Sequence, residues 1–452
     1  MDNSQININQ DFKSLLVLKL IFWLSLLGVL LSIIVSHLLK RTVFVYDLSY
    51  FLLVSFVGLA LIQIKKWRST QLVITNMLLI IYCIFITLPL TVFHGNIYAF
   101  LVFIKNSVLF SFLFFYYQKK LNTIDRTIEF ISTLVKGGLF YSVYLHIEFV
   151  NKLFNIAPSA TEAINSFYMG SNLTGIAVYA DPDQFDILTI IRPMGLEISF
   201  AAGGFFLSSI FFIVLISGRR FFKSDFQRFC VLILLYSSVF ITTSRQIIFS
   251  MHILLILIAI SSLIFKRIRN MEFWKSTIGV LMIFFLSALL LLKFYPNSEH
   301  LDFFANAGGQ TGEVLRDDIE ELFSKVIFVF SEYPLAAMFG IGGYTPTYPG
   351  FYPNLPSPNE LHYLFDIPYS MGFVGACIYW YVFIYSIRRS WLACLRSKYI
   401  HEDYTDIFLV CLVLGLSVVM CLVHYSPMGL STIFLIALIP HIANFPRRDW
   451  IE

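Results

Sequence analysis

Residues 200–217 read FAAGGFFLSSIFFIVLIS, a run without a single charged side chain. The run belongs to a longer apolar stretch, 195–217, which is long enough to cross the hydrocarbon core of a bilayer as an α-helix. Lipid offers the backbone no hydrogen-bonding partner, so only helices and closed barrels can span it. The strands of a barrel alternate between apolar and polar residues, and an unbroken apolar run therefore predicts a helix.

Runs of similar length recur along the whole chain, and we expect about twelve transmembrane helices. The predicted spans are 16–38, 43–64, 71–92, 97–117, 128–154, 195–217, 226–243, 247–265, 275–295, 367–386, 405–424 and 427–444. Hydrophobic residues make up 58% of the chain and charged residues 13%, and the mean hydropathy is +0.77. No soluble protein carries so little charge on its surface. The sequence therefore predicts an all-α, polytopic integral membrane helix bundle in which residues 1–452 form a single membrane domain.

Clusters of lysine and arginine predict the orientation of this bundle. If the N-terminus lies in the cytoplasm, six basic clusters fall on the cytoplasmic side, as the positive-inside rule requires. These clusters are 65–68, 119–120, 219–220, 266–269, 388–389 and 447–448. One pair, Lys40-Arg41, falls on the other side. Both termini are thus predicted to be cytoplasmic, and because the basic residues follow the loops, the net charge of +4 does not indicate a nucleic-acid partner.

Two segments on the outer side are too long to be simple turns, 155–191 and 295–366. Loops of such length usually carry function. In the second loop, apolar residues recur at helical spacing with acidic residues between them, which predicts an amphipathic helix over 312–332 near the membrane surface. These apolar residues are Leu315, Ile319, Leu322, Val326 and Val329. The aromatic segment 339–359 follows, and its glycines and prolines oppose regular structure.

Two arginines are predicted at the outer ends of spans, where the positive-inside bias would select against them. Arg192 opens the sixth span, and Arg245 lies in the turn Thr243-Ser-Arg-Gln246 between the seventh and eighth spans. A guanidinium stays charged in partly dry surroundings and holds phosphate oxygens with two parallel hydrogen bonds, which suits a lipid-linked pyrophosphate. The alternative is that these arginines reach to the membrane surface or pair with Glu197 or Asp366.

His362 follows the aromatic segment, just before the tenth span. A histidine titrates near neutral pH, so it can take a proton from a sugar hydroxyl or donate one to a phosphate. His424, at the outer end of the eleventh span, competes for this role, and either histidine could serve as a simple hydrogen-bonding residue. The carboxylates of Asp181-Pro-Asp-Gln-Phe-Asp186 could act as a base or as metal ligands, although Asp-Pro is chiefly a turn signal.

Metal-ligand and disulfide patterns are not found in the sequence. No group of His, Cys or acidic residues has the spacing of a metal site, and we expect none to be required. The six cysteines include no C-x-x-C pair and are expected to be free thiols. Lys105 and Lys136 fall well inside the fourth and fifth spans, where a charge usually faces a polar cavity and where Asp47 could supply a partner. Lys19 is equally well explained by a side chain that reaches to the membrane surface.

Several short motifs follow one another in a fixed order along the second half of the chain. They are an Arg-x-x-Gly segment (192–195), a Ser-Arg turn (244–245), Arg316 with an amphipathic stretch, Tyr333-Pro-Leu335, Phe339-Gly-Ile-Gly-Gly343, His362 and Gly372-Phe-Val-Gly375. In this order, and in its overall topology, the chain resembles the O-antigen polymerase and ligase family of bacterial envelope glycosyltransferases, the Wzy and WaaL type. Tyr363 departs from the family pattern, in which Asn, Ser or Gln usually follows the histidine.

The resemblance implies a metal-independent glycosyltransferase of the GT-C type, without a cofactor, in lipopolysaccharide or other surface polysaccharide biosynthesis. A glycan would pass from undecaprenyl pyrophosphate to an acceptor sugar hydroxyl at the periplasmic face of the inner membrane. Arg192 and Arg245 would hold the pyrophosphate, and His362 would activate or orient the acceptor hydroxyl. The expected substrate contacts are Arg316, Glu197, and the aromatic faces of Tyr344, Tyr348, Phe351 and Tyr352.

The implied partners are an undecaprenyl-pyrophosphate-linked oligosaccharide, membrane lipid and a chain-length regulator protein, with no nucleic acid. A polymerase, which joins lipid-linked repeat units, is favoured over a ligase that transfers finished glycan to lipid A core, because the histidine motif is loose. A third interpretation from another class is a transporter or flippase for an anionic lipid-linked substrate, which would line its path with such cations. No internal repeat is visible in the sequence, and its absence disfavours the transporter.

Overall fold

The computed structural model describes most of the predicted membrane region. The described stretches are 3–39, 70–93, 108–154, 200–242, 245–264, 334–342, 363–395, 404–421 and 431–445, together with a few single positions between them. Every regular element in these stretches is a helix, and they contain no strand. The predicted all-α class is therefore confirmed for this part of the chain.

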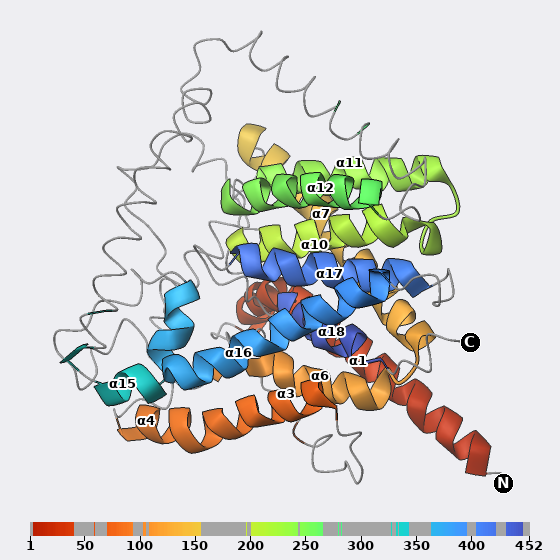
Figure 1. Ribbon diagram of the computed structural model, residues 1–452. Helices are drawn as coiled ribbons and strands as arrows, with labels where there is room; N and C mark the ends of the chain where they lie inside the picture. Colours follow the sequence, from red (N-terminus) through yellow and green to blue (C-terminus); the bar gives the residue numbers. More distant parts are fainter. Residues whose placement is uncertain are drawn as a thin grey trace.

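The helices form one bundle, drawn in Figure 1. In chain order the α-helices are α1 (Asn3–Leu39), α3 (Gln71–Tyr82), α4 (Leu88–Phe93), α6 (Leu109–Lys120), α7 (Ile124–Phe154), α10 (Phe200–Ser217), α11 (Asp225–Ile241), α12 (Arg245–Ile264), α15 (Pro334–Phe339), α16 (Tyr363–Leu395), α17 (Thr405–Cys421) and α18 (Thr432–Ala443). A π-helix, η1 (Cys83–Thr87), joins α3 to α4, and a 3-10 turn, η4 (Gly218–Arg220), ends α10. Hydroxyl caps fix two of the starts: Thr70 accepts from the Val73 amide and Ser224 from the Gln227 amide.

Four helices in the described part of the chain are long and apolar enough to cross a membrane. They are Gln71–Val92, Ile124–Asn151, Ala202–Arg220 and Ile367–Leu395. Four shorter apolar helices accompany them: Leu15–Gly28, Ile247–Ile258, Thr405–Met420 and Thr432–Ala443. These lengths support a helical membrane protein. The predicted spans 43–64 and 275–295 and part of 97–117 lie outside the described residues, so the number twelve stays a prediction.

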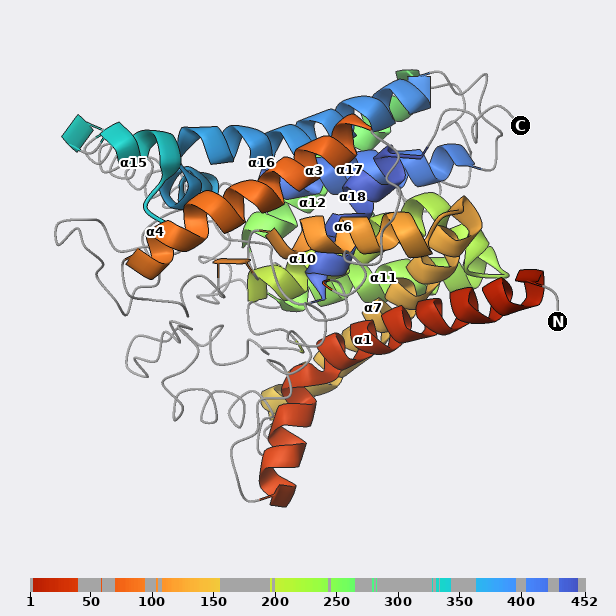
Figure 2. The same ribbon diagram turned by 90° about the horizontal axis from the view of Figure 1, so that it is seen from below.

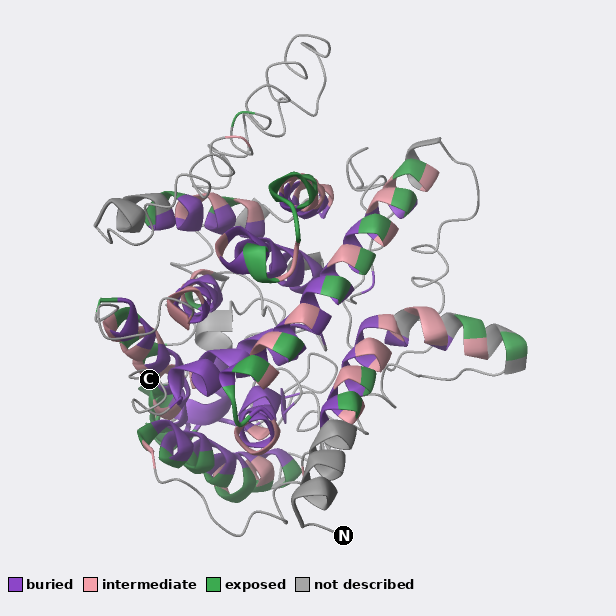
Figure 3. Ribbon diagram, turned by 90° about the vertical axis from the view of Figure 1, so that its right-hand side faces the viewer, coloured by how far each residue is buried: buried purple, intermediate pink, exposed green. Residues whose placement is uncertain are grey.

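The run at 200–217 forms the centre of the bundle. α10 contacts α7, α11, α12, α17 and α18, and its residues from Ala202 to Leu215 are all buried. A helix that is apolar on every side needs such surroundings. α18 is just as enclosed, since every residue from Ser431 to Phe445 is buried. Figure 3 shows the buried residues gathered in the middle and the exposed ones on the outward faces.

One end of the bundle carries the basic clusters that the structure describes, 119–120, 219–220 and 388–389. Arg220 at the end of α10 donates to both carboxylate oxygens of Asp406 at the start of α17, at 2.7 and 2.8 Å. Lys119-Lys120 end α6 close by in the fold, and Arg389 in the last turns of α16 donates to the Phe445 carbonyl. We refer to this end as the basic end.

A chain of polar side chains links four elements at the basic end. The Thr70 hydroxyl donates to Oδ1 of the Asn444 side chain at 2.6 Å, and Nδ2 of Asn444 donates to Oε1 of Gln118 at 2.9 Å. The Gln118 amide in turn donates to Nδ1 of His441 at 3.0 Å. Thr127 already donates to a backbone carbonyl, so Nε2–H of His441 donates to the Thr127 hydroxyl at 3.1 Å. The end of α18 is thus bonded to α6, to α7 and to the residue that caps α3.

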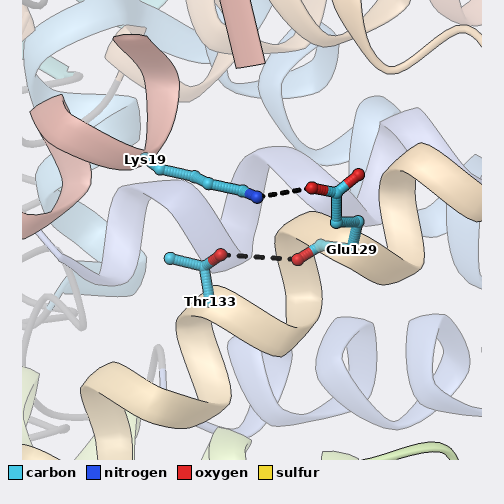
Figure 4. Close-up of polar contacts among 3 residues, drawn as sticks. All are labelled: Lys19, Glu129 and Thr133. Atoms are coloured by element: carbon cyan, nitrogen blue, oxygen red, sulfur yellow. Dashed lines mark hydrogen bonds and ion pairs between the residues drawn. The ribbon is translucent and has the colours of Figure 1, made fainter. Parts of the chain in front are cut away.

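α1 is fixed to α7 by an ion pair. Nζ of Lys19 lies 2.6 Å from a carboxylate oxygen of Glu129, and the Glu129 carbonyl accepts from Thr133 (Figure 4). Lys136 is exposed on α7, so it is not a buried charge; that it faces a polar cavity stays a prediction. Lys105 and Asp47 lie outside the described residues. Five cysteines are described and all are free thiols, as predicted; the side chain of Cys421 is not described.

Candidate functional site

Most of the residues predicted to form the site lie outside the described residues. They are Arg192, Glu197, Arg316, Tyr344, Tyr348, Phe351, Tyr352 and His362, as well as the competing His424 and the acidic motif 181–186. The first long loop, 155–191, lies outside them too, and of the predicted amphipathic helix 312–332 only Ile327, Ser331 and Glu332 are described, as helical. Arg245 is described by its backbone, as the first residue of α12.

The start of α12 lies at the end of the bundle opposite the basic end. α11 begins at Asp225, next to the basic turn η4, and runs away from it to Ile241 before α12 starts back at Arg245. The first turns of α10 reach the same place, because a Cβ added to Gly204 would lie 3.1 Å from the Thr242 hydroxyl and 3.4 Å from Ile247. The helix that follows Arg192 in the sequence therefore begins beside the helix that starts with Arg245.

Polar side chains continue along α12 from this end. His252 follows Arg245 by two helical turns, which places both residues on one face of the helix. Nδ1–H of His252 donates to the Ile248 carbonyl at 2.7 Å, so Nε2 accepts from the Tyr236 hydroxyl of α11 at 2.8 Å. His146 of α7 lies 2.8 Å from the Ser142 carbonyl oxygen and 2.9 Å from the Ser237 hydroxyl of α11. These contacts support a role of both histidines in joining the helices.

At the same end, two glycine segments far apart in the sequence bond to each other through their backbones. The Ile341 amide donates to the Tyr369 carbonyl at 3.0 Å, and the Gly342 amide donates to the Ser370 carbonyl at 3.1 Å. The first segment directly follows α15, and the second is the bend of α16, at Gly372. We call the contact between 339–342 and 369–372 the glycine clasp.

The clasp depends on glycine at two positions where the chains touch. Gly340 and Gly372 have φ values of +82° and +66°, in the left-handed region that other residues rarely adopt. A Cβ added to Gly340 would lie 2.2 Å from the Ser370 carbonyl oxygen, and one added to Gly372 would lie 2.4 Å from the Gly340 amide nitrogen. Each glycine thus leaves the space that the other segment fills.

A tyrosine from α3 completes the clasp. The hydroxyl of Tyr82 lies 2.6 Å from the Met371 carbonyl oxygen and 3.2 Å from that of Phe339, so one donor bridges both segments. η1 begins directly after Tyr82, and the bent α16 packs along α3 and η1, as Figure 2 shows. Sequence analysis missed Tyr82, because a tyrosine within an apolar run is ordinary. The feature that could have indicated its role is a hydroxyl group in an apolar segment, which offers few hydrogen-bonding partners of its own.

The clasp brings together two motifs that the sequence analysis singled out, Phe339–Gly343 and Gly372–Gly375. Between them run residues 343–362, which contain His362 and the tyrosines predicted to contact sugars. That segment lies outside the described residues, but both of its ends are fixed to the bundle.

Replacing Tyr82 by phenylalanine is expected to lower the free energy of unfolding by about 2 kcal/mol, because it leaves the buried carbonyl of Met371 and the partly buried carbonyl of Phe339 without their shared donor. The matched control is Tyr117→Phe, since the Tyr117 hydroxyl also donates to a buried carbonyl, that of Phe434, at 3.1 Å. Loss of a single bond there is expected to lower the free energy by about 1 kcal/mol. Unfolding of the detergent-solubilised variants measures both, and equal losses would contradict a bridging role for Tyr82.

Acidic, histidine and cysteine side chains do not gather into a group of three or more that could hold a metal within the described stretches. The expectation that no metal is required stays a prediction, because the acidic motif 181–186 lies outside those stretches. The described part of the site thus consists of backbone, glycines and hydroxyls at one end of the bundle, with Arg245 at the start of α12.

Comparison with known proteins identifies no relative of this chain. No family model matches the chain, and neither the curated proteins nor the solved structures include a match. The resemblance to the O-antigen polymerase and ligase family therefore rests on the motifs quoted above and on their order along the chain.

Proposed function

We propose that this chain is a polysaccharide polymerase that transfers an undecaprenyl-pyrophosphate-linked glycan to the acceptor sugar of another lipid-linked repeat unit. The observation that carries the proposal is the glycine clasp, since it ties together the two glycine motifs of the resemblance. These motifs are separated in the sequence, and their contact in the fold is a physical reason why both occur in one chain. It supports a loop, carrying His362, that is anchored on both sides.

The proposed topology has about twelve spans, with the basic end in the cytoplasm and the glycine clasp at the periplasmic face of the bacterial inner membrane. The positive-inside rule supports this orientation, because the described basic clusters 119–120, 219–220 and 388–389 gather at one end. Arg245 begins its helix at the other end, with the clasp. A positive residue on the periplasmic side calls for a ligand that binds it.

In the proposed reaction, the acceptor hydroxyl oxygen forms a bond to the anomeric carbon of the donor glycan while the bond from that carbon to the pyrophosphate oxygen breaks. His362 takes the hydroxyl proton or orients the hydroxyl. Arg192 and Arg245 hold the pyrophosphate and stabilise the negative charge that it gains as the leaving group. Undecaprenyl pyrophosphate is released. Arg316, Glu197 and the tyrosines of 344–352 bind the sugars or fix the loop.

Purified protein in liposomes, supplied with undecaprenyl-pyrophosphate-linked repeat units, tests this proposal. A polymerase produces longer lipid-linked glycans and releases undecaprenyl pyrophosphate. If the substrate only moves across the bilayer, the protein is a transporter and the proposal is wrong. The repeat units must come from the bacterium that makes this protein, because the sugars of the repeat unit differ between strains.

Deletion in cells separates a polymerase from a ligase. Loss of a polymerase leaves single repeat units attached to the lipid A core, whereas loss of a ligase leaves a core without any repeat unit. Electrophoresis of the lipopolysaccharide shows the difference directly. A core without repeat units would therefore replace the proposed polymerase by a ligase.

A further inference from the structure

α15 is exposed although it contains no polar side chain. Its sequence is Pro-Leu-Ala-Ala-Met-Phe, from Pro334 to Phe339, and only Ala336 is buried. Leu335 is 73% exposed, and Met338 and Phe339 are exposed on the same side. A short helix without a polar face has no stable place in water, because its apolar surface would remain hydrated.

The surroundings of α15 are apolar and exposed as well. Phe373, just after the bend of α16, is 68% exposed, and Phe85 in η1 is 70% exposed. Both residues belong to helices that are long and apolar enough to cross a membrane. α15 packs against α16 beside the outer part of α4, as Figures 1 and 2 show. α15 therefore packs on a candidate span, α16, whose exposed apolar side chains are expected to face lipid.

The backbone that follows α15 finds hydrogen-bonding partners within the protein. In lipid, non-helical backbone is tolerated only where the protein itself supplies the hydrogen-bonding partners. The amides of Gly340, Ile341 and Gly342 donate to the carbonyls of Ala336, Tyr369 and Ser370 at 2.8, 3.0 and 3.1 Å. The hydroxyl of Tyr82 serves the carbonyls that the bend exposes. These bonds supply partners from within the protein for three amides and two carbonyls of the turn.

We propose that residues 334–342 form a re-entrant element whose exposed face lies in membrane lipid. α15 lies in the leaflet at the clasp end of the bundle and packs on α16, and the chain turns at the glycine clasp. The occupant of the exposed face is lipid hydrocarbon, which matches the side chains of Leu335, Met338 and Phe373. The proposal concerns the membrane and stands apart from the proposed enzymatic function.

Quenching of a fluorescent label by nitroxide lipids tests the proposal in the full-length protein in liposomes. The exposed Cys230 and Cys377, and Cys421, are first replaced by serine. Single labels are then placed through Leu335→Cys and through two controls. Phe85→Cys lies on a candidate span, and Phe226→Cys, at a residue that is 76% exposed between the exposed Asp225 and Gln227, reports the water boundary at the basic end.

The label introduced by Leu335→Cys is expected to be quenched by nitroxide lipids as strongly as the label introduced by Phe85→Cys, and several-fold more than that introduced by Phe226→Cys. A water-soluble quencher should give the reverse order. Strong quenching from water alone would overturn the proposal, and so would protection from both quenchers with cross-linking between two copies. If the first variant does not fold, Met338→Cys decides, since that residue lies one turn away on the same face.

Discussion

The Gly340→Ala variant is expected to unfold with a free energy about 3 kcal/mol lower than that of the wild type. A non-glycine residue in the left-handed region costs about 1–2 kcal/mol. The added methyl carbon would also lie 2.2 Å from the Ser370 carbonyl oxygen, a backbone atom that cannot move without breaking the Ile341 and Gly342 hydrogen bonds. Each of these bonds contributes about 1 kcal/mol.

Gly372→Ala is expected to cause a similar loss, because its methyl group would meet the Gly340 amide and the Met338 carbonyl, each at 2.4 Å. Both substitutions open the same contact, so their combined effect should be clearly smaller than the sum. Thermal or denaturant unfolding in detergent measures the three variants. Additive losses would mean that the two glycines act independently, contrary to the clasp.

Gly58→Ala is the matched control for both glycine variants. Gly58 is helical, and within the described part of the chain an added Cβ would meet no atom within 4 Å. Alanine is preferred to glycine in a helix by about 0.5–1 kcal/mol, so this variant should be as stable as the wild type or slightly more so. A large loss here would show that the measurement responds to any added methyl group.

Arg245→Gln is expected to lower the rate of glycan transfer by about 100-fold or more, while the protein stays folded in the membrane. In the proposed reaction the guanidinium stabilises charge on the leaving pyrophosphate, and glutamine retains only part of its hydrogen bonding and none of its charge. Arg245→Lys keeps the charge without the planar fork, so its rate of glycan transfer should lie between those of the wild type and of Arg245→Gln. Arg192→Gln is expected to behave as Arg245→Gln does.

The control for these variants is Arg388→Gln, which removes an exposed arginine at the basic end. It is expected to leave transfer unchanged, because that end lies away from the proposed donor. Product length on a gel and protein level in the membrane are measured together. Full activity of Arg245→Gln at a normal protein level would remove the pyrophosphate site from the start of α12.

The helices themselves could be predicted from hydropathy, whereas their ends could not. The span predicted at 367–386 is the central part of α16, which continues to Leu395. The charges of Arg388 and Arg389 end the apolar run, but the helix goes on because Arg389 finds the Phe445 carbonyl as a partner at the basic end. A hydropathy pattern indicates whether a residue is surrounded by lipid or by water, but it does not indicate specific hydrogen bonds such as this one.

The candidate site could be predicted only in its local motifs. The family resemblance singled out the motifs 339–343 and 372–375, but nothing in the sequence pairs Ile341 with Tyr369 across the bend. The role of Tyr82 was even harder to predict, because its hydroxyl bonds to carbonyls that are 257 and 289 residues away in the sequence. Lys136 shows the opposite error: its place within an apolar run suggested a buried charge, whereas its flexible side chain is exposed on α7.

The enclosed position of α18 has a consequence for how the protein is made. Translation proceeds from the N-terminus, so α6 and α7 reach the bilayer long before residue 441 is translated. Until then Gln118 and Thr127 have polar groups without the imidazole that they hold in the finished protein. The nascent bundle therefore lacks these bonds until α18 is translated, and a chain truncated before residue 431 would leave Gln118 and Thr127 without this partner.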